Sequence, residues 1–282
     1  MTINYRKSLI SLLGVSLAAL AWFGTVDDYG REYADKGFKR ALITFAVART
    51  LNGVISVAQG TEVAVQPAGV GINFTPGEIL DPINDLIERF SWVMLASSTS
   101  LGLQKLLLAI FASSAFTVVI MLALLVAVVA LWYPRQRPEW LKPLAYKVAL
   151  VVLVLRFAIP VIAIASEGVF HLFLEEQYTS SSQGIEQTTD DIARVNSQTE
   201  AQRPVTGEDS LLARARRLYE NATASMDIQA YIARYKAAAT NASEHAINLI
   251  VIFILQTVLI PLLFLWLLVR LVKRLSHFNP LS

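Results

Sequence analysis

The sequence predicts an all-α integral membrane protein with four transmembrane helices, a long extracytoplasmic helical hairpin and a small extracytoplasmic β-hairpin. The chain is 55% apolar and 16% charged, with a mean hydropathy of +0.51. Soluble domains contain about 25% charged residues. The apolar residues are also clustered, because residues 106–132 and 247–269 contain no charged side chain. Each of these two stretches exceeds the roughly 20 residues that cross a hydrocarbon core.

Two weaker apolar stretches complete the four predicted spans. Residues 9–24 follow Arg6 and Lys7, a pattern shared by signal peptides and by membrane anchors. We expect this stretch to remain attached as an anchor. Residues 144–166 form the other span, which contains Arg156 near its middle. One intramembrane arginine costs about 3 kcal/mol on insertion scales, which weakens the prediction without excluding it.

The charges of the loops predict the orientation. Residues 25–104 and 167–244 together contain 21 acidic and 13 basic residues. The other side of the membrane has Glu139 as its one acid. Its bases are Arg6, Lys7, Arg135, Arg137, Lys142, Lys147, Arg270, Lys273 and Arg274. The positive-inside rule therefore places both termini in the cytoplasm, and we expect a multi-pass protein of a bacterial inner (plasma) membrane.

A six-span alternative is less consistent with these charges. Residues 39–59 and 90–104 are fairly apolar and could add two spans without moving either terminus. That topology would place residues 60–88 in the cytoplasm, although this stretch contains five acids and no lysine or arginine. We therefore interpret 90–104 as part of an interfacial or re-entrant helix.

This topology divides the chain into eight segments. In the extracytoplasmic region 25–104, alternating apolar residues flank a Gln66-Pro67-Ala68-Gly69 turn, which predicts the β-hairpin. In the extracytoplasmic region 169–245, Pro204 and Gly207 separate the two helices of the predicted hairpin. The segments are an anchor (1–24), an extracytoplasmic region with helix, β-hairpin and interfacial helix (25–104), a second span (105–133), a basic cytoplasmic loop (134–147), a third span (148–168), the extracytoplasmic helical hairpin (169–245), a fourth span (246–270) and a cytoplasmic tail (271–282).

An apolar seam follows the second helix of that hairpin. Ile228, Tyr231, Tyr235 and Ala238 recur at steps of three and four residues. The seam could pack inside a solvated antiparallel hairpin, or it could join one subunit to another.

A polar cluster is predicted where the third and fourth spans leave the membrane. Glu167, His171 and Glu175 are spaced four residues apart, and His245 is expected at the same level on the neighbouring helix. Two imidazoles with carboxylates could bind a divalent cation or transfer protons. Such residues are also common beside lipid headgroups, and their spacing matches no compact metal motif. We predict no bound metal.

A second polar set is predicted near the middle of the bilayer. Helix rise places Arg156, Gln256, Ser113, Ser114 and Thr117 at similar depths. We find no acidic residue inside the four predicted spans that could neutralise Arg156. The arginine could therefore line a pathway for anions, or it could be satisfied by neighbouring polar groups in a packing role.

The sequence predicts no enzyme, cofactor or nucleic-acid partner. It contains no cysteine and three histidines, and it lacks the common hydrolase, nucleotide-binding and metalloprotease motifs. We expect a homo-oligomer in the lipid bilayer, forming a pore or channel for ions or small solutes. The alternative is a non-transporting envelope scaffold or accessory subunit that docks a partner protein through its extracytoplasmic helices.

Overall fold

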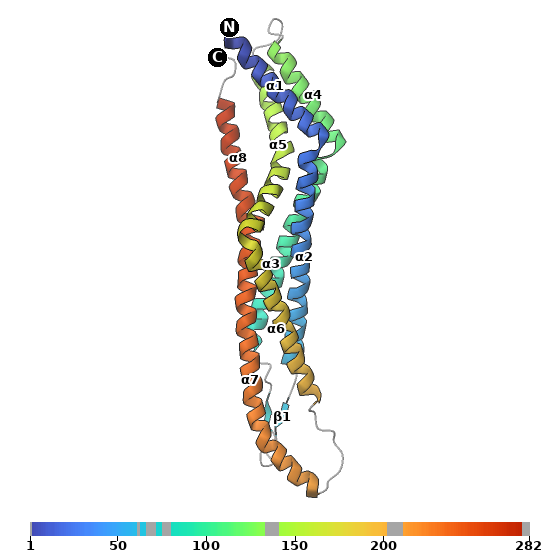
Figure 1. Ribbon diagram of the computed structural model, residues 1–282, viewed down its shortest axis with the longest axis vertical. Coiled ribbons are helices and arrows are strands. Elements are labelled where there is room, and N and C mark those ends of the chain that lie inside the picture. The colour runs from blue at the N-terminus through green and yellow to red at the C-terminus, as the bar shows by residue number, and fades with distance from the viewer. Residues whose placement is uncertain are drawn as a thin grey trace. The chain divides into compact units, whose positions relative to one another are not determined.

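The computed structural model of this 282-residue chain describes the backbone of residues 2–60, 63–65, 72–74, 80–132, 141–201 and 211–277. Side chains are described for residue 12 and for 14–60, 80–129, 147–197 and 232–274. Figure 1 shows the elements. They are α1 (Thr2–Phe23), α2 (Thr25–Gln59), β1 (Val63–Val65), β2 (Ile72–Phe74), α3 (Asp81–Phe111), α4 (Ser114–Trp132), α5 (Leu141–Val169), the π-helical turn η3 (Phe170–Leu174), α6 (Glu175–Ala201), α7 (Leu211–Ile254), the π-helical turn η4 (Leu255–Leu259) and α8 (Ile260–His277).

The chain folds as two compact units. Unit 1 contains Met1–Arg40, Ser97–Phe173 and Leu255–Ser282. Unit 2 contains Ala41–Ala96 and Leu174–Ile254.

The structure confirms a helical protein with four helices that are long and apolar enough to cross a membrane. Within the described residues these are Thr25–Gln59, Asp81–Phe111, Lys147–Ser197 and Ile232–Arg274. The last two contain most or all of the predicted spans 144–166 and 247–269. The other two differ from our prediction, because the apolar parts of the predicted first and second spans fall in the shorter helices Gly14–Phe23 and Ser114–Val129.

The prediction of one continuous helix over 106–132 was wrong. Helix α3 ends at Phe111 and α4 begins at Ser114. Ser113 caps α4, because its Oγ accepts a hydrogen bond from the backbone N–H of Phe116 at 3.3 Å. The rings of Phe111 and Phe116 pack edge to face, with centroids 4.8 Å apart. A small polar residue inside an apolar stretch therefore divides it into two helices.

Unit 1 is built around α1, α4, α5 and α8. Helix α4 packs against α1 and α5, and α5 also packs against α8. Helix α4 contains no charged residue, and its side chains Val118, Leu122 and Leu125 are exposed. Helix α8 likewise exposes Leu262 and Leu263. The outer faces of these helices are therefore as apolar as a protein core.

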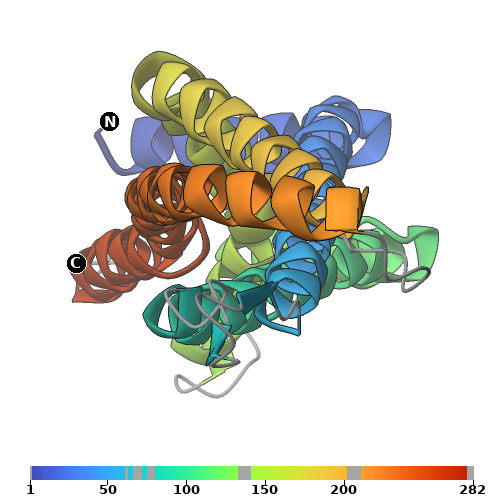
Figure 2. The same cartoon turned by 90° about the horizontal axis from the view of Figure 1, so that it is seen from below.

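Unit 2 is a bundle with a heptad core. Buried residues recur at alternating steps of three and four along α2, α3, α6 and α7, the spacing of coiled-coil seams. Figure 2 shows α6 and α7 side by side, in agreement with their extensive contact. The core includes Ala41, Ala48, Leu51, Ile55 and Ala58 of α2, Ile87, Phe90 and Met94 of α3, Ile185, Ile192 and Val195 of α6, and Tyr235, Ala239, Ala242, Ala246 and Leu249 of α7.

Two polar contacts show the relative direction of α2 and α6 in unit 2. The Thr44 and Tyr178 hydroxyls lie 3.3 Å apart, and Asn196 Nδ2 donates to the Val54 carbonyl oxygen at 3.2 Å. The residue numbers of both helices rise from the first contact to the second, so α2 and α6 run parallel.

Strands β1 and β2 pair antiparallel, with Val63 opposite Phe74 and Val65 opposite Ile72. The turn predicted at 66–69 lies outside the described residues.

Candidate functional site

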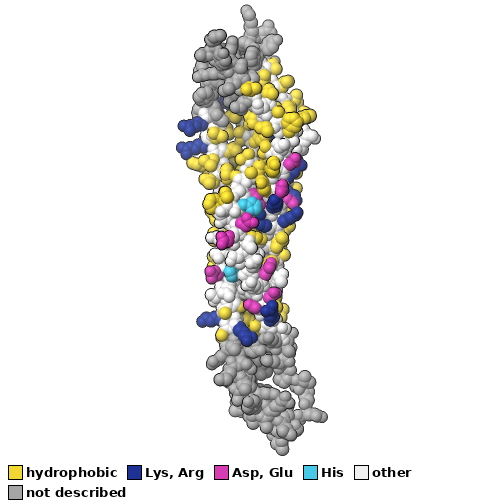
Figure 3. Space-filling model, in the orientation of Figure 1, with side chains coloured by type: hydrophobic (Ala, Val, Ile, Leu, Met, Phe, Trp, Pro, Cys, Tyr) yellow, Lys and Arg dark blue, Asp and Glu magenta, His cyan; other side chains and the backbone are white. Residues whose placement is uncertain are grey.

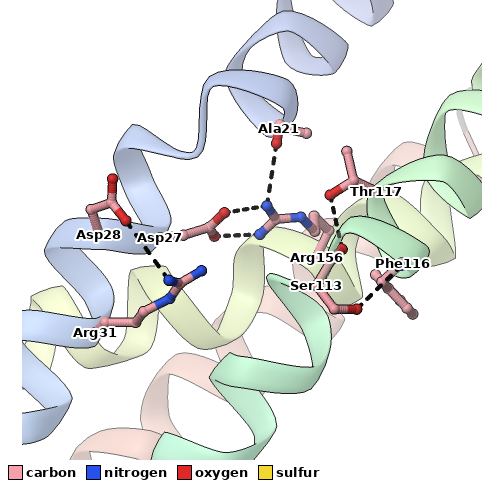
Figure 4. A network of polar contacts seen from close by, with 8 residues as sticks. All are labelled: Ala21, Asp27, Asp28, Arg31, Ser113, Phe116, Thr117 and Arg156. Carbon is pink, nitrogen blue, oxygen red and sulfur yellow. Dashed lines mark hydrogen bonds and ion pairs between the residues drawn. The ribbon is translucent and has the colours of Figure 1, made fainter.

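A buried ion pair joins α2 to α5 inside unit 1. Arg156 of α5 is 1% exposed, and its Nη1 and Nη2 donate to the two carboxylate oxygens of Asp27. Nη2 also donates to the Ala21 carbonyl oxygen at 3.4 Å. Figure 4 shows the guanidinium of Arg156 facing the Asp27 carboxylate. The two charges therefore neutralise each other in a bidentate contact.

The backbone at the start of α2 explains the position of Asp27. Gly24, between α1 and α2, has a φ of +67°, a conformation that glycine adopts without steric cost. The amide of Asp27 donates to the Gly24 carbonyl oxygen at 2.9 Å. Asp27 thus lies in the first turn of α2, where the helix dipole favours a carboxylate. The turn presents this carboxylate to Arg156.

A glycine one turn further along allows α2 to approach α5 closely. A Cβ atom at Gly30 would lie 3.1 Å from Cα of Pro160 and 3.3 Å from Cδ1 of Leu108. Both distances are shorter than an ordinary carbon–carbon contact. The close approach supports the ion pair, because it holds the two helix backbones at fixed spacing.

The expectation that no acid neutralises Arg156 was therefore wrong. Asp27 lies just beyond the apolar stretch 9–24, so a search restricted to the predicted spans missed it. The proximity of an acid to the end of the anchor was the signal available in the sequence. Arg156 contacts both Ala21 and Asp27, which places it level with the end of α1.

The predicted mid-bilayer set is brought together only in part. Thr117 Oγ1 donates to the Ser113 carbonyl oxygen at 3.1 Å, and Ser114 is an exposed residue at the start of α4. Gln256 is buried in η4. Its Nε2 lies close to the backbone of Gly37, because a Cβ atom added at Gly37 would be 3.4 Å from it. Within the described residues, no hydrogen bond joins Gln256 to Arg156. The five residues do not form one hydrogen-bonded layer.

A second buried ion pair joins α2 and α5. Glu167 is 2% exposed, and Arg40 Nη1 donates to its Oε1 at 2.7 Å while Nη2 donates to Oε2. The Arg40 guanidinium also lies 3.6 Å from the centroid of the Phe170 ring. His171 Nε2 is 3.2 Å from Glu167 Oε1. The predicted proximity of Glu167 and His171 is present, whereas sequence reasoning missed Arg40.

The other two members of the predicted outer cluster belong to unit 2. Glu175 is exposed at the start of α6. His245 packs against Gly184 so closely that a Cβ atom there would lie 2.2 Å from the imidazole Nε2. In the described part of the chain, no group of three or more His, Cys, Asp or Glu side chains is placed to hold a metal ion.

At Tyr235 the predicted subunit seam packs against another helix of the same chain. This side chain is 3% exposed, and its hydroxyl donates to Asn196 Oδ1 of α6 at 2.7 Å. Ala238 is half-buried, and the side chains of Ile228 and Tyr231 lie outside the described residues. Of the two alternatives for the seam, Tyr235 therefore agrees with packing inside the hairpin, because this position of the heptad faces α6.

The two ion pairs fix the register of α2 against α5. The pairs are separated by roughly 18 Å of helix at 1.5 Å per residue. Removing one partner of a buried pair costs about 3–5 kcal/mol, so a shift of either helix along the other would be unfavourable. The two pairs therefore hold these helices in place.

The chain was compared with protein-family models, curated proteins and solved structures, and it matches none of them.

Proposed function

We propose that this protein is a non-transporting scaffold or accessory subunit of a bacterial inner membrane. Unit 1 anchors it in the bilayer, and unit 2 is a docking module on the extracytoplasmic side for another envelope protein. The main support is that Arg156 and Glu167, the charges best suited to a transport pathway, each form a bidentate ion pair within unit 1. Their charge is used to hold helices together.

The exposed side chains of unit 1 support its place in the bilayer. Helices α1, α4, α5 and α8 expose large apolar residues, among them Trp22, Leu125, Val151 and Leu263. A contiguous apolar surface of this kind is unfavourable in water and favourable against lipid tails. We therefore assign the four membrane spans to these helices. The basic loops at their cytoplasmic ends give the orientation, with both termini inside.

The heptad pattern of unit 2 supports its place in water. Helices α2 and α3 are apolar enough to cross a membrane, but their buried residues follow the seam of a helical bundle. Helix α6 exposes polar and charged residues, including Glu176, Gln187 and Asp190. A helix that buries one stripe and exposes a charged face is typical of a soluble bundle. The apolar content of α2 and α3 is thus explained by core packing.

Exposed apolar residues of unit 2 support a docking role. Trp92 is 64% exposed, and Ile43 and Val57 are each more than half exposed. Tryptophan is enriched in protein interfaces, where it contributes a large share of the binding energy. The competing proposal, an oligomeric pore, has weaker support, because it depended on an unneutralised Arg156 and on Tyr235 at a subunit contact.

Site-specific photo-crosslinking from position 92 in living cells tests the docking proposal. The expected product is an adduct with one other envelope protein, absent when the crosslinker is placed at Gln183 on α6. A product of twice 31.1 kDa, together with ion flux through reconstituted vesicles, would instead support the oligomeric pore. Substitution Trp92→Ala should weaken the partner complex while leaving membrane insertion unchanged.

A further inference from the structure

Helix α8 changes from apolar to basic along its length. Trp266, Arg270, Lys273 and Arg274 are spaced by four, three and one residues, which places them on neighbouring parts of one helix face. The helix contains no acidic residue. Figure 3 shows basic side chains beside hydrophobic ones on the described part of α8. This end of the helix therefore combines positive charge with an apolar surface.

A shallow hollow lies along this basic end of α8. The Arg270 guanidinium lies 5.2 Å from the centroid of the Trp266 ring, within the range of a cation–π contact. The hollow is lined by Leu267, Arg270, Leu271, Lys273 and Arg274. The two leucines are about half exposed, as is Trp266. Three cations thus lie beside apolar side chains that are open to a ligand.

A phosphodiester attached to acyl chains is complementary to this combination. Arginine binds phosphate oxygens through paired N–H groups, and lysine adds a point charge. Leu267 and Leu271 offer a surface for the first methylenes of an acyl chain. Trp266 has the amphipathic ring that is enriched at membrane interfaces. A free inorganic phosphate would use the cations but would leave the leucines and the indole without a partner.

We propose that this hollow binds the headgroup of an anionic phospholipid in the cytoplasmic leaflet. The proposal rests on the membrane placement of unit 1 proposed above, and it is independent of any docking by unit 2. Basic residues beside a membrane span attract anionic lipid by about 1 kcal/mol each, which corresponds to about a 5-fold change in affinity per cation. The bound lipid would fix the depth and rotation of α8.

The full-length protein in lipid nanodiscs provides the test. Brominated phosphatidylglycerol and brominated phosphatidylcholine quench the fluorescence of nearby tryptophans. The difference in quenching between the natural chain and the Trp266→Phe variant gives the contribution of Trp266. We expect phosphatidylglycerol to quench Trp266 at a lower mole fraction than phosphatidylcholine. Replacing Arg270 and Arg274 by Gln should reduce this preference about 30-fold, from two cations at the value above. The matched control replaces Arg194 and Lys236, exposed cations of unit 2, by Gln and should leave the preference unchanged.

Three results would overturn the proposal. Equal quenching by both lipids, with quenching of Trp22 of α1 retained, would exclude the headgroup site and leave the membrane placement intact. Release of the lipid by millimolar inorganic phosphate would indicate a site for an aqueous anion. Absence of quenching at both Trp22 and Trp266 would contradict the membrane placement itself.

Discussion

Breaking the Asp27–Arg156 ion pair from one side should destabilise unit 1 more than removing both charges. Asp27→Asn leaves a buried guanidinium without a counter-charge, and Arg156→Leu leaves a buried carboxylate. Each single change should cost about 3–5 kcal/mol. The double variant contains neither buried charge, so its cost should be smaller than that of either single variant. The coupling energy of the cycle should therefore be about 3 kcal/mol or more.

An exposed pair in the same turn of α2 provides the matched control. Arg31 Nη1 lies 4.0 Å from Asp28 Oδ1, and both side chains are more than half exposed. Figure 4 shows this pair beside the buried one. Exposed ion pairs contribute up to about 1 kcal/mol, so Arg31→Leu should change stability by no more than this.

Thermal unfolding of the purified protein in detergent measures the cycle. The single variants should lower the Tm on the order of 10 °C, given about 2–4 °C per kcal/mol for chains of this size. The double variant should recover most of that loss. Equal destabilisation by the single and double variants would refute the pairing, and stabilisation by Arg156→Leu alone would show that no buried carboxylate depends on it.

Further predictions concern glycines and one tyrosine. Gly30→Ala should cost about 1–3 kcal/mol, because its Cβ would press on the proline of α5. Gly53→Ala, on the same helix with nothing within 4 Å, should instead raise stability by up to about 1 kcal/mol; a loss there would contradict the packing of α2. Gly184→Ala should destabilise unit 2 through its contact with the imidazole of His245, and His245→Ala should relieve that loss in thermal unfolding. Tyr235→Phe should cost about 1 kcal/mol and leave the mass in detergent unchanged, whereas a lower mass would restore the subunit seam.

Local pattern was sufficient to predict several features of the fold. The charge-free stretches predicted apolar helices, and residues 144–166 and 247–269 lie largely or wholly inside two of the four long apolar helices. The spacing of Glu167 and His171 predicted that their side chains meet. These features depend on residues within one helix, where the period of 3.6 residues fixes which side chains are neighbours.

The features that sequence reasoning missed depend on contacts between distant segments. Asp27 and Arg40 meet residues more than a hundred positions away on α5, and no pattern within α2 identifies those partners. Ser113 was interpreted as a polar group of a span, whereas its hydroxyl caps a new helix. The apolar content of α2 and α3 was also ambiguous, because lipid-facing and bundle-facing residues have similar hydropathy.

Cysteine labelling at Thr50 tests the proposal that unit 2 lies in water. Thr50 is exposed on α2, a helix that is apolar enough to cross a membrane, and the natural chain contains no cysteine. In spheroplasts, Thr50→Cys should react with a membrane-impermeant maleimide added outside, whereas Gln136→Cys in the basic loop should react only after the membrane is opened. If Thr50→Cys reacts only after detergent solubilisation, α2 lies within the bilayer, which would contradict the placement of unit 2 in water.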